Sequence, residues 1–367
     1  MSAARTWAGP SWRRELAIAG VALALVVLLG SVLVTAFGRS PITVWATMVG
    51  DTLGDRYAVG QVLYRATGLA LTGLAVALAL DVGLFNIGVE GQMTAGVVAA
   101  AATGAALPAA TPAPVAVLLC TLAAASAGGA IAAVTGALRV WRGAHEVITG
   151  IMLNAVVAGG ALWLGNEVLF APGGTRSRPI VAAAELPGLG LAGSAASAAV
   201  LIAVASAITL HVVRTRTSAG LIWRAVGASP GAAAAMGHAV GRWRLGVMIA
   251  SGALAGLVAT SVVLGHKHAF EEGLGRGTGY LGVAVALLGR RHPLGVLAAA
   301  LAVAFFSHGG LVVGELVPKE LTELLLGALV LAIAVAPTVV GWAAEAAGAA
   351  RAPGSTPTAA SAEGPSA

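Results

Sequence analysis

Long apolar runs alternate with short polar connections along most of this 367-residue chain. A helix needs about 20 mostly apolar residues to cross the core of a bilayer, and most of the runs are close to that length. The pattern predicts an all-α, polytopic membrane protein with about ten transmembrane or re-entrant helices. The segments expected to form them are residues 16–37, 62–80, 93–107, 115–138, 147–170, 191–213, 245–264, 280–289, 294–313 and 321–342.

The eighth segment, at 280–289, is much shorter than the others. At this length it is expected to form a short or re-entrant helix, unless residues 275–279 extend it. Arg65 lies near the start of the second segment, and its long side chain is expected to reach outward to the membrane surface.

Basic residues favour one side of the expected membrane domain, and such an excess marks the cytoplasmic side. Thirteen of the 21 Lys and Arg residues lie there, at positions 5, 13, 14, 139, 142, 214, 216, 224, 242, 244, 290, 291 and 351. Both termini are therefore expected to be cytoplasmic, with a short N-terminal segment at 1–15. The membrane domain then covers 16–342, with a cytoplasmic loop at 214–244. A tail at 343–367, rich in Ala, Ser, Pro and Gly, is expected to be disordered.

Composition strengthens the assignment to the membrane. Hydrophobic residues make up 58% of the chain and charged residues only 10%, which leaves too few polar side chains to cover a soluble protein of this size. The net charge of +6 fits a positive-inside bias. A nucleic-acid partner is excluded, because no long basic block with interleaved aromatic residues occurs. The single cysteine, Cys120, lies in an apolar run and can form neither a disulfide nor a cysteine-based metal site within one chain.

The most unusual stretch is residues 83–92, a glycine-rich polar interruption between two apolar runs. Its side chains include Phe85, Asn86, Glu90 and Gln92, and polar groups are costly at membrane depth unless they are used or satisfied. The glycines favour a break between helices or an unwound helix. These residues are candidates for a translocation pathway. Alternatively, Glu90 lies at the membrane interface and Asn86 caps a helix.

A second polar stretch covers residues 145–154. Asn154 follows Glu146 by about two helical turns, so the two side chains share a face and could line one lumen. Asn154 is therefore a further pathway candidate, although it could equally be a hydrogen-bonding contact between helices. His145 is interpreted as a membrane-interface residue.

A third stretch, residues 223–237, belongs to the basic loop. Ser229 and Pro230 have the form of a helix cap and first helical residue, the following alanines favour a helix, and Gly237 can end it. A helix here could dock a soluble partner or could be an ordinary loop helix.

Several motifs are missing from the sequence. There is no GxxxxGK[ST] phosphate loop, so the chain does not bind ATP by that route, and no HExxH or Cys/His cluster for a metal. No catalytic residues are assigned, and an intramembrane enzyme is disfavoured. A chain of buried acids, as a proton-coupled carrier would use, is not visible.

Taken together, four stretches resemble the permease subunits of bacterial ABC importers of the branched-chain amino acid and simple-sugar superfamily. More narrowly, they resemble the nucleoside-type branch, which is associated with a basic-membrane-protein-like lipoprotein. The resemblance covers most of residues 16–340. The stretches are GLFNIGVEGQ at 83–92, HEVITGIMLN at 145–154, RAVGASPGAAAAMG at 224–237 and GVAVALLGRRHPLGV at 282–296.

The resemblance implies a multi-pass permease in the bacterial cytoplasmic membrane. Its partners would be a paralogous permease subunit, a cytoplasmic ABC ATPase, a substrate-binding lipoprotein, membrane lipid and a small-molecule solute. No cofactor is expected, because ATP is used by the partner ATPase. The residues implied to couple to this ATPase are Arg224, Val226, Gly227, Pro230, Met236 and Gly237.

The sequence departs from the family pattern at three places. The family often has Asn where Ser229 stands, Tyr near Ala235 or Met236, and Asn where His145 stands. These differences concern the coupling segment more than the family resemblance.

The solute class follows from the candidate pathway. Amides and one carboxylate suit a neutral, hydrogen-bonding solute such as a nucleoside, whereas an anion would need Arg or Lys there. Three alternatives stay open: a permease for simple sugars, an ion- or proton-coupled carrier working alone, and a membrane scaffold without transport.

Overall fold

The computed structural model describes residues 11–171 and 173–351, and all regular elements in this part of the chain are helical. The α-helices are α1 (Ser11–Ala36), α2 (Pro41–Gly54), α3 (Arg56–Asp81), α4 (Val89–Ala106), α5 (Ala113–Arg142), α6 (Glu146–Leu164), α7 (Ala199–Arg216), α8 (Ser218–Ala228), α9 (Pro230–Ala235), α10 (Val240–Gly256), α11 (Thr278–Leu288), α12 (Pro293–Val312) and α13 (Lys319–Arg351). The π-helices η1 (Gly165–Leu169) and η3 (Thr260–Lys267) follow α6 and α10, and the 3₁₀-helices are η2 (Ala182–Ala184) and η4 (Val313–Glu315).

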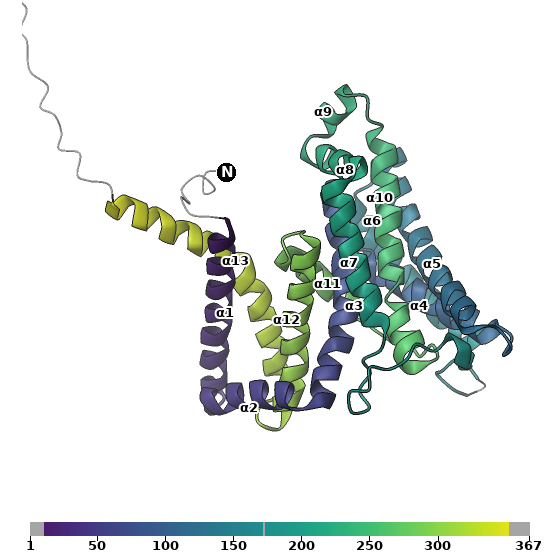
Figure 1. Cartoon of the computed structure of the whole chain (residues 1–367), viewed down its shortest axis with the longest axis horizontal. Coiled ribbons are helices and arrows are strands. Elements are labelled where there is room, and N and C mark those ends of the chain that lie inside the picture. The colour runs from purple at the N-terminus through teal and green to yellow at the C-terminus, as the bar shows by residue number, and fades with distance from the viewer. Residues whose placement is uncertain (1–10, 172, 352–367) are drawn as a thin grey trace, which may run out of the picture.

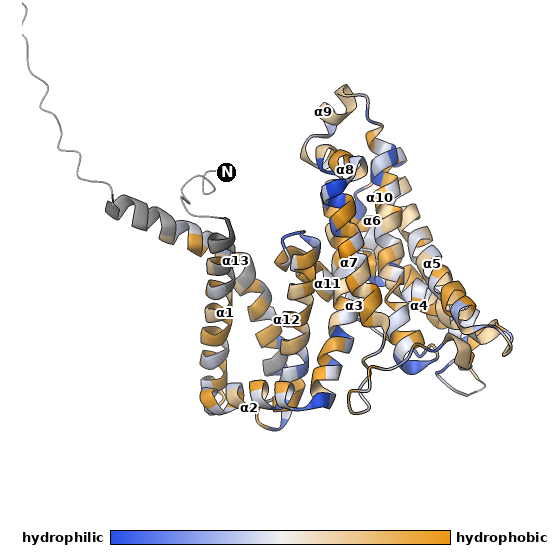
Figure 2. Cartoon of the chain, viewed as in Figure 1, coloured by the Kyte–Doolittle hydropathy of each residue, from blue (hydrophilic) through white to orange (hydrophobic). Residues whose placement is uncertain are grey.

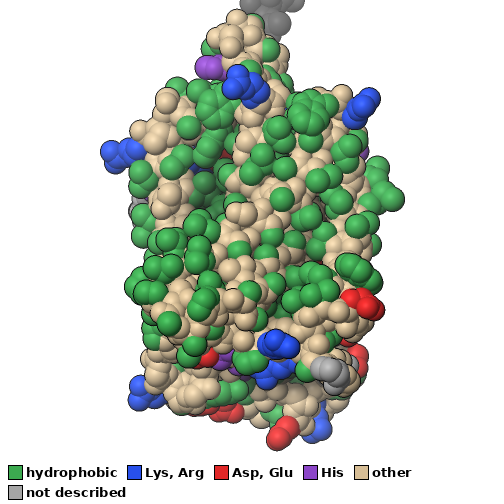
Figure 3. Space-filling view, turned by 90° about the vertical axis from the view of Figure 1, so that its right-hand side faces the viewer, with side chains coloured by type: hydrophobic (Ala, Val, Ile, Leu, Met, Phe, Trp, Pro, Cys, Tyr) green, Lys and Arg blue, Asp and Glu red, His purple; other side chains and the backbone are tan. Residues whose placement is uncertain are grey.

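Six stretches of the described chain are long and apolar enough to cross a membrane: α3, α5, α6 with η1, α7, α10 with η3, and α12 with η4. Apolar residues follow the helices along their lengths (Figure 2). On the face shown in Figure 3, apolar side chains cover the middle, and charged side chains gather toward the two ends. The protein is therefore a multi-pass membrane protein. The total of about ten membrane segments and the cytoplasmic location of the termini remain predictions.

The helices α8 and α9 lie at one end of the molecule, and α2 lies crosswise at the other (Figure 1). Between these ends runs α3, which starts where the Asp55 carboxylate accepts a hydrogen bond of 3.0 Å from the backbone N–H of Tyr57. In its most apolar 18-residue window, 83% of α3 is buried, against 17% for α6. The long helix α3 is thus the centre of the packing, whereas α6 leaves most of its surface open to lipid or to another protein.

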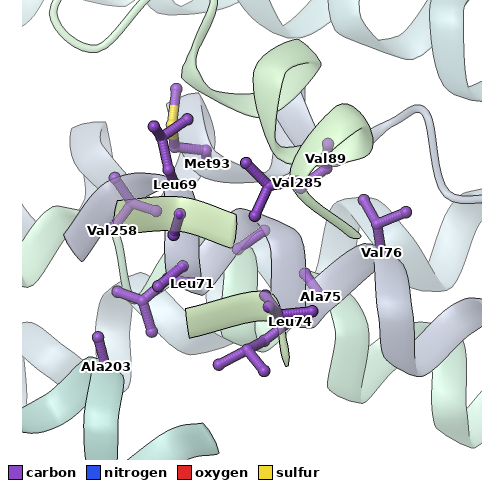
Figure 4. Close-up of a cluster of buried hydrophobic side chains, with 14 of the residues drawn as sticks. Leu69, Leu71, Leu74, Ala75, Val76, Val89, Met93, Ala203, Val258 and Val285 are labelled. Carbon is purple, nitrogen blue, oxygen red and sulfur yellow. The ribbon is translucent and has the colours of Figure 1, made fainter. Parts of the chain in front are cut away.

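The core forms where α3 meets α4, α10 and α11. Leu69, Leu71 and Leu74 of α3 are buried, and they lie in one cluster with Met93 of α4 and Val285 of α11 (Figure 4). Beside this cluster, α5 and α10 approach through small residues. A Cβ atom on Gly252 would overlap the Gly128 backbone and the Ala132 side chain. Such close backbone contact is a usual way for membrane helices to associate, because lipid provides no hydrophobic drive.

Two helices begin inside the molecule rather than at its ends. The segment 82–88 leads from the end of α3 to the start of α4, and residues 268–277 lead from η3 to the start of α11. With 11 residues, α11 is about 16 Å long, roughly half of a bilayer core. It is the short helix that the sequence predicts near 280–289, extended by two residues at its start. The first turns of α4 and α11 are in contact, since a Cβ atom on Gly279 would lie 2.6 Å from Glu90 Cα.

Some expected boundaries differ from the observed ones. The last helix continues through Arg351 rather than ending at 342, because 343–351 is rich in alanine, a strong helix former. Disorder was expected there, and the rest of the tail lies outside the described residues. At the other end, α1 begins at Ser11, so 1–15 is not a separate segment; residues 1–10 also lie outside the described part. The segment expected at 191–213 becomes helical only at Ala199, after a glycine- and serine-containing turn.

The sequence analysis did not predict α2. Its 14 residues mix apolar side chains with Asp51 and several small polar residues, so hydropathy alone predicts a polar connection between two membrane helices. The helix buries only Val44, Met48 and Thr52 among its residues. An orientation across the bundle, as seen in Figure 1, suits a helix with one narrow buried stripe.

Candidate functional site

Asn86 and Gln92 form the centre of a buried polar network at the break between α3 and α4. The Asn86 Nδ2 atom donates hydrogen bonds of 2.8 Å to Gln92 Oε1 and 2.8 Å to Ser251 Oγ. In return, Gln92 Nε2 donates to Asn86 Oδ1 at 3.0 Å. Ser251 Oγ on α10 donates to the Ala75 carbonyl on α3 at 2.6 Å. The network therefore fastens the break to α3 and α10.

These two amides do not line the large cavity described below. Asn86 is 1% exposed and Gln92 is fully buried, and their hydrogen bonds go to each other and to Ser251. Buried polar groups of this kind stabilise one conformation when they are satisfied. In this conformation, the two residues therefore hold the break in shape, and their place on a translocation pathway stays a prediction.

Glu90 caps the start of α11. Its Oε1 atom accepts a hydrogen bond of 2.7 Å from Gly277 N, and its Oε2 atom accepts one of 2.8 Å from Gly279 N. The first N–H groups of a helix have no partner within the helix, and the positive end of the helix dipole favours a carboxylate. Gly277, at the cap position of α11, has no side chain to fill this role. Glu90 therefore joins the beginnings of α4 and α11.

Asn154 of α6 is the third connection at this place. Its Oδ1 atom accepts a hydrogen bond of 2.8 Å from Gly91 N, and its Nδ2 atom donates to the Ile87 carbonyl at 2.9 Å and to Tyr280 Oη at 3.3 Å. The predicted bond between helices is thus present. Asn154 also lines the cavity described below. Its role in a translocation pathway stays a prediction.

A cavity of about 520 Å³ lies between α4, α6, the segment 270–276 and α11. This volume is within the range of small-molecule sites. Its polar lining includes Glu90, Thr94, Asn154, Arg276 and Tyr280, while small and apolar residues of α6 form the opposite wall. Glu272 adds a second carboxylate, so the lining can offer an amide, two carboxylates, a guanidinium, a hydroxyl and a phenol for hydrogen bonding.

Phe85 lies partly buried in the break. Its backbone N–H donates to Glu146 Oε1 at 3.4 Å, and Glu146 Oε2 lies 3.2 Å from Arg139 Nε. Glu146 therefore ties the break to the end of α5 instead of facing the cavity with Asn154. The shared helical face expected for these two residues does not place them in one lumen.

The coupling segment of the sequence forms α9 and the second half of α8. Ser229 Oγ accepts a hydrogen bond of 3.3 Å from Ala232 N, Pro230 is the first residue of α9, and Gly237 follows the helix with φ +86°. The predicted cap, start and end of this helix are thus confirmed. Met236 is 64% exposed and Val226 is fully buried.

Residues 224 and 227 differ in their surroundings. The exposed Arg224 donates from Nε to the Gly220 carbonyl at 3.3 Å within α8. Gly227 faces the end of α3, where a Cβ atom would overlap the Asp81 carbonyl oxygen and lie 3.3 Å from Gly83 N. Only glycine permits this approach, so α8 rests directly on the residues that open the break.

Polar contacts reinforce this junction. Asp81 Oδ2 lies 2.9 Å from Arg214 Nε at the end of α7, and Arg244 Nε donates to the Val82 carbonyl at 3.4 Å. The sequence analysis did not predict the contacts of the three charged residues, Asp81, Arg214 and Arg244. One signal was available, because an acid in the last turn of a helix opposes the helix dipole and indicates a cationic partner.

No group of three or more His, Cys, Asp or Glu residues that could hold a metal ion occurs in the described part of the chain.

Comparison with known proteins gives consistent matches over most of the chain. A family model described as a branched-chain amino acid transport system permease component matches residues 58–334. A glucose ABC transporter permease protein of Haloferax volcanii is 34% identical over 82% of this chain and 82% of its own length. A guanosine ABC transporter permease protein of Bacillus subtilis is 31% identical, covering 86% and 91%. A nucleoside ABC transporter permease protein of Lactococcus lactis is 28% identical, covering 88% and 91%.

No solved structure gives a significant match. The family match extends from α3 to α13 and includes the break, the cavity and the helices α8 and α9. The chain therefore belongs to the family of branched-chain amino acid transport system permease components, as a multi-pass subunit related to nucleoside ABC permeases.

Proposed function

We propose that this chain is the permease subunit of an ATP-driven importer for nucleosides, that it forms half of the translocation pathway, and that it couples to a separate ATPase. The observation that carries the proposal is the continuity from α8 to the cavity. Gly227 of α8 packs on Asp81, the break begins at the next residues, and Glu90 at its far end lines the cavity. A movement of α8 would therefore reach the cavity through one continuous segment.

The energy for transport would come from the partner. A conformational change requires a ligand or partner that interacts differently with the two states, and ATP binding to an ATPase docked on α8 and α9 would supply this difference. The exposed Leu221 and Met236 give that end of the molecule apolar contacts for such a partner. This end would be cytoplasmic, in agreement with the basic residues of the loop 214–244.

The cavity suits a neutral solute with several hydrogen-bonding groups, because its lining has one guanidinium, Arg276, against the two carboxylates of Glu90 and Glu272 and so offers no excess positive charge to an anion. Asn154, Thr94 and Tyr280 can donate or accept, and Glu90 can accept from a hydroxyl or amine. Two relatives named for guanosine and nucleosides favour a nucleoside. The relative named for glucose supports a simple sugar as the second candidate, since sugar hydroxyls could use the same groups.

A paralogous permease subunit and a substrate-binding lipoprotein would complete the importer. The open face of α6 supports such a pairing, because Ile151, Met152 and Val156 are at least half exposed next to the cavity wall. A second subunit on this face would close the pathway on the side away from α4. The assembly would lie in the bacterial cytoplasmic membrane.

Uptake by proteoliposomes that contain all four components tests the proposal. Guanosine and glucose would be compared with and without ATP on the ATPase side. We expect guanosine uptake that requires ATP and all four components. Preferential glucose uptake would favour the sugar permease, and gradient-driven uptake by the chain alone, independent of ATP, would overturn the importer proposal.

A further inference from the structure

Arg65 places a charged side chain deep within α3. It lies nine residues after Arg56, the first residue of this 26-residue helix, which corresponds to about 14 Å along the axis. The sequence suggested that its side chain reaches outward. The residue is partly exposed, but its Nε atom is buried without a hydrogen-bond partner, and the side chain lines a cavity.

The guanidinium group of Arg65 uses few of its five N–H donors. Its Nη1 atom donates one long hydrogen bond, 3.4 Å, to Ser307 Oγ of α12. Within the described part of the chain, Arg65 takes part in no ion pair. A cation at membrane depth is costly unless it is paired, and such residues usually mark functional sites. The described residues therefore provide no ion-pair partner for this guanidinium group.

The cavity in front of Arg65 has a volume of about 260 Å³ and a cationic lining. A second guanidinium comes from Arg276, and hydroxyl groups come from Ser261, Thr278 and Ser307. None of the residues in its wall is Asp or Glu. The nearby carboxylate of Glu90 is bound to the backbone N–H groups of Gly277 and Gly279, so it does not fill this cavity.

We propose that this cavity binds an oxyanion, a phosphate or carboxylate group, held by Arg65 and Arg276. A planar guanidinium matches two oxygen atoms of such a group, and hydroxyl donors complete its coordination. The volume is several times the ~30 Å³ that one water molecule occupies in the liquid, so a phosphate fits. The group could belong to a free anion or to the head group of a phospholipid.

This site is separate from the proposed solute site, although Gly273 and Arg276 contribute to both cavities. Its test measures binding to the permease without any transport, so it can fail or succeed independently of nucleoside import. The experiment uses the full chain purified in a maltoside detergent, which carries no phosphate.

Thermal unfolding, followed by the fluorescence of the eight Trp residues, would be measured with rising inorganic phosphate against sodium chloride of equal ionic strength. We expect phosphate to raise the unfolding temperature of the wild type. Arg65→Gln should weaken the apparent affinity by about tenfold or more, because it removes charge-assisted hydrogen bonds. Arg178→Gln, at an exposed arginine of the 171–190 loop, should leave the affinity unchanged.

Two further measurements complete the test. Arg65→Lys keeps the charge but loses the paired donors, so it should fold and bind phosphate more weakly than the wild type. Quantitative lipid analysis distinguishes the source: about one more phospholipid retained per wild-type chain than per Arg65→Gln chain would support the site and assign it to a head group. A wild type with neither a phosphate shift nor extra lipid would overturn the proposal, as would equal phosphate affinities of the wild type and both Arg65 variants.

Discussion

Gly227→Ala should separate ATP hydrolysis from solute uptake. The added Cβ atom would overlap the Asp81 carbonyl oxygen, which belongs to the backbone and cannot rotate away. Either α8 moves away from the end of α3, or the break at 82–88 shifts with it. Both outcomes change the contact through which α8 would act on the cavity.

The size of the effect follows from two opposing terms. Alanine is favoured over glycine within a helix by about 1 kcal/mol, whereas overpacking of a close contact costs about 1–3 kcal/mol. The net loss of stability is thus small, about 0–2 kcal/mol by these terms. The functional loss should be larger, because a displacement of about 1 Å in a positioned contact can cost up to about 100-fold in rate. We expect ATP-dependent uptake to fall by about tenfold or more.

The matched control is Gly231→Ala in α9. A Cβ atom at Gly231 would meet nothing within 4 Å, so the same substitution four residues further along the chain adds no contact. Uptake and ATP hydrolysis would be measured in the same proteoliposomes, with the amount of assembled importer determined by quantitative blotting. Normal uptake by Gly227→Ala, or equal losses in both variants, would refute the role of this contact in coupling.

Three other substitutions test the contacts around the break. Asp81→Asn should lower stability by about 2–3 kcal/mol, somewhat less than for a fully buried pair, because the Arg214 side chain is 21% exposed; thermal unfolding checks this, and an unchanged midpoint would contradict it. Ser251→Ala should cost about 1–2 kcal/mol, since Asn86 Nδ2 loses one acceptor; stability equal to the wild type would show that the network is dispensable. Burial, assisted by nearby basic groups, lowers the pKa of His292. As the pH falls, His292 is therefore protonated in the unfolded chain before it is protonated in the folded chain. The free energy of unfolding should be highest above about pH 7 and decrease as the pH drops through ~6.5 toward the pKa of His292 in the folded chain. His292→Gln should flatten this dependence, and an identical pH profile would exclude His292 as its source.

Local signals in the sequence predict local structure well. Ser229, Pro230 and Gly237 mark a helix cap, start and end because each acts on its own neighbouring backbone. The short helix near 280–289 follows from the length of its apolar run. For the same reason, the polar and glycine-rich composition of 83–92 indicated a break between helices.

The partners across the chain could not be predicted in this way. The bond from Asn86 to Ser251 joins residues 165 positions apart, and the bond from Glu90 to Gly279 spans 189. Such pairings depend on how the helices pack, which hydropathy along the chain does not encode. The position of Arg65 illustrates the limit: the apolar run suggests a segment that starts near Val62, but α3 begins at Arg56, so Arg65 lies nine residues into the helix, where it bonds to Ser307 of α12.

The central claim is that the cavity of about 520 Å³ lies on the path of the solute. It is tested most directly by Thr94→Cys in a Cys120→Ala background, which removes the single native cysteine. A water-soluble thiol reagent should then block ATP-driven guanosine uptake, and saturating guanosine should slow this inactivation by at least about threefold. The control is Thr175→Cys, on an exposed loop, which should react with the reagent without loss of uptake. Uptake that persists after complete labelling at position 94, or a block that guanosine does not slow, would contradict the account.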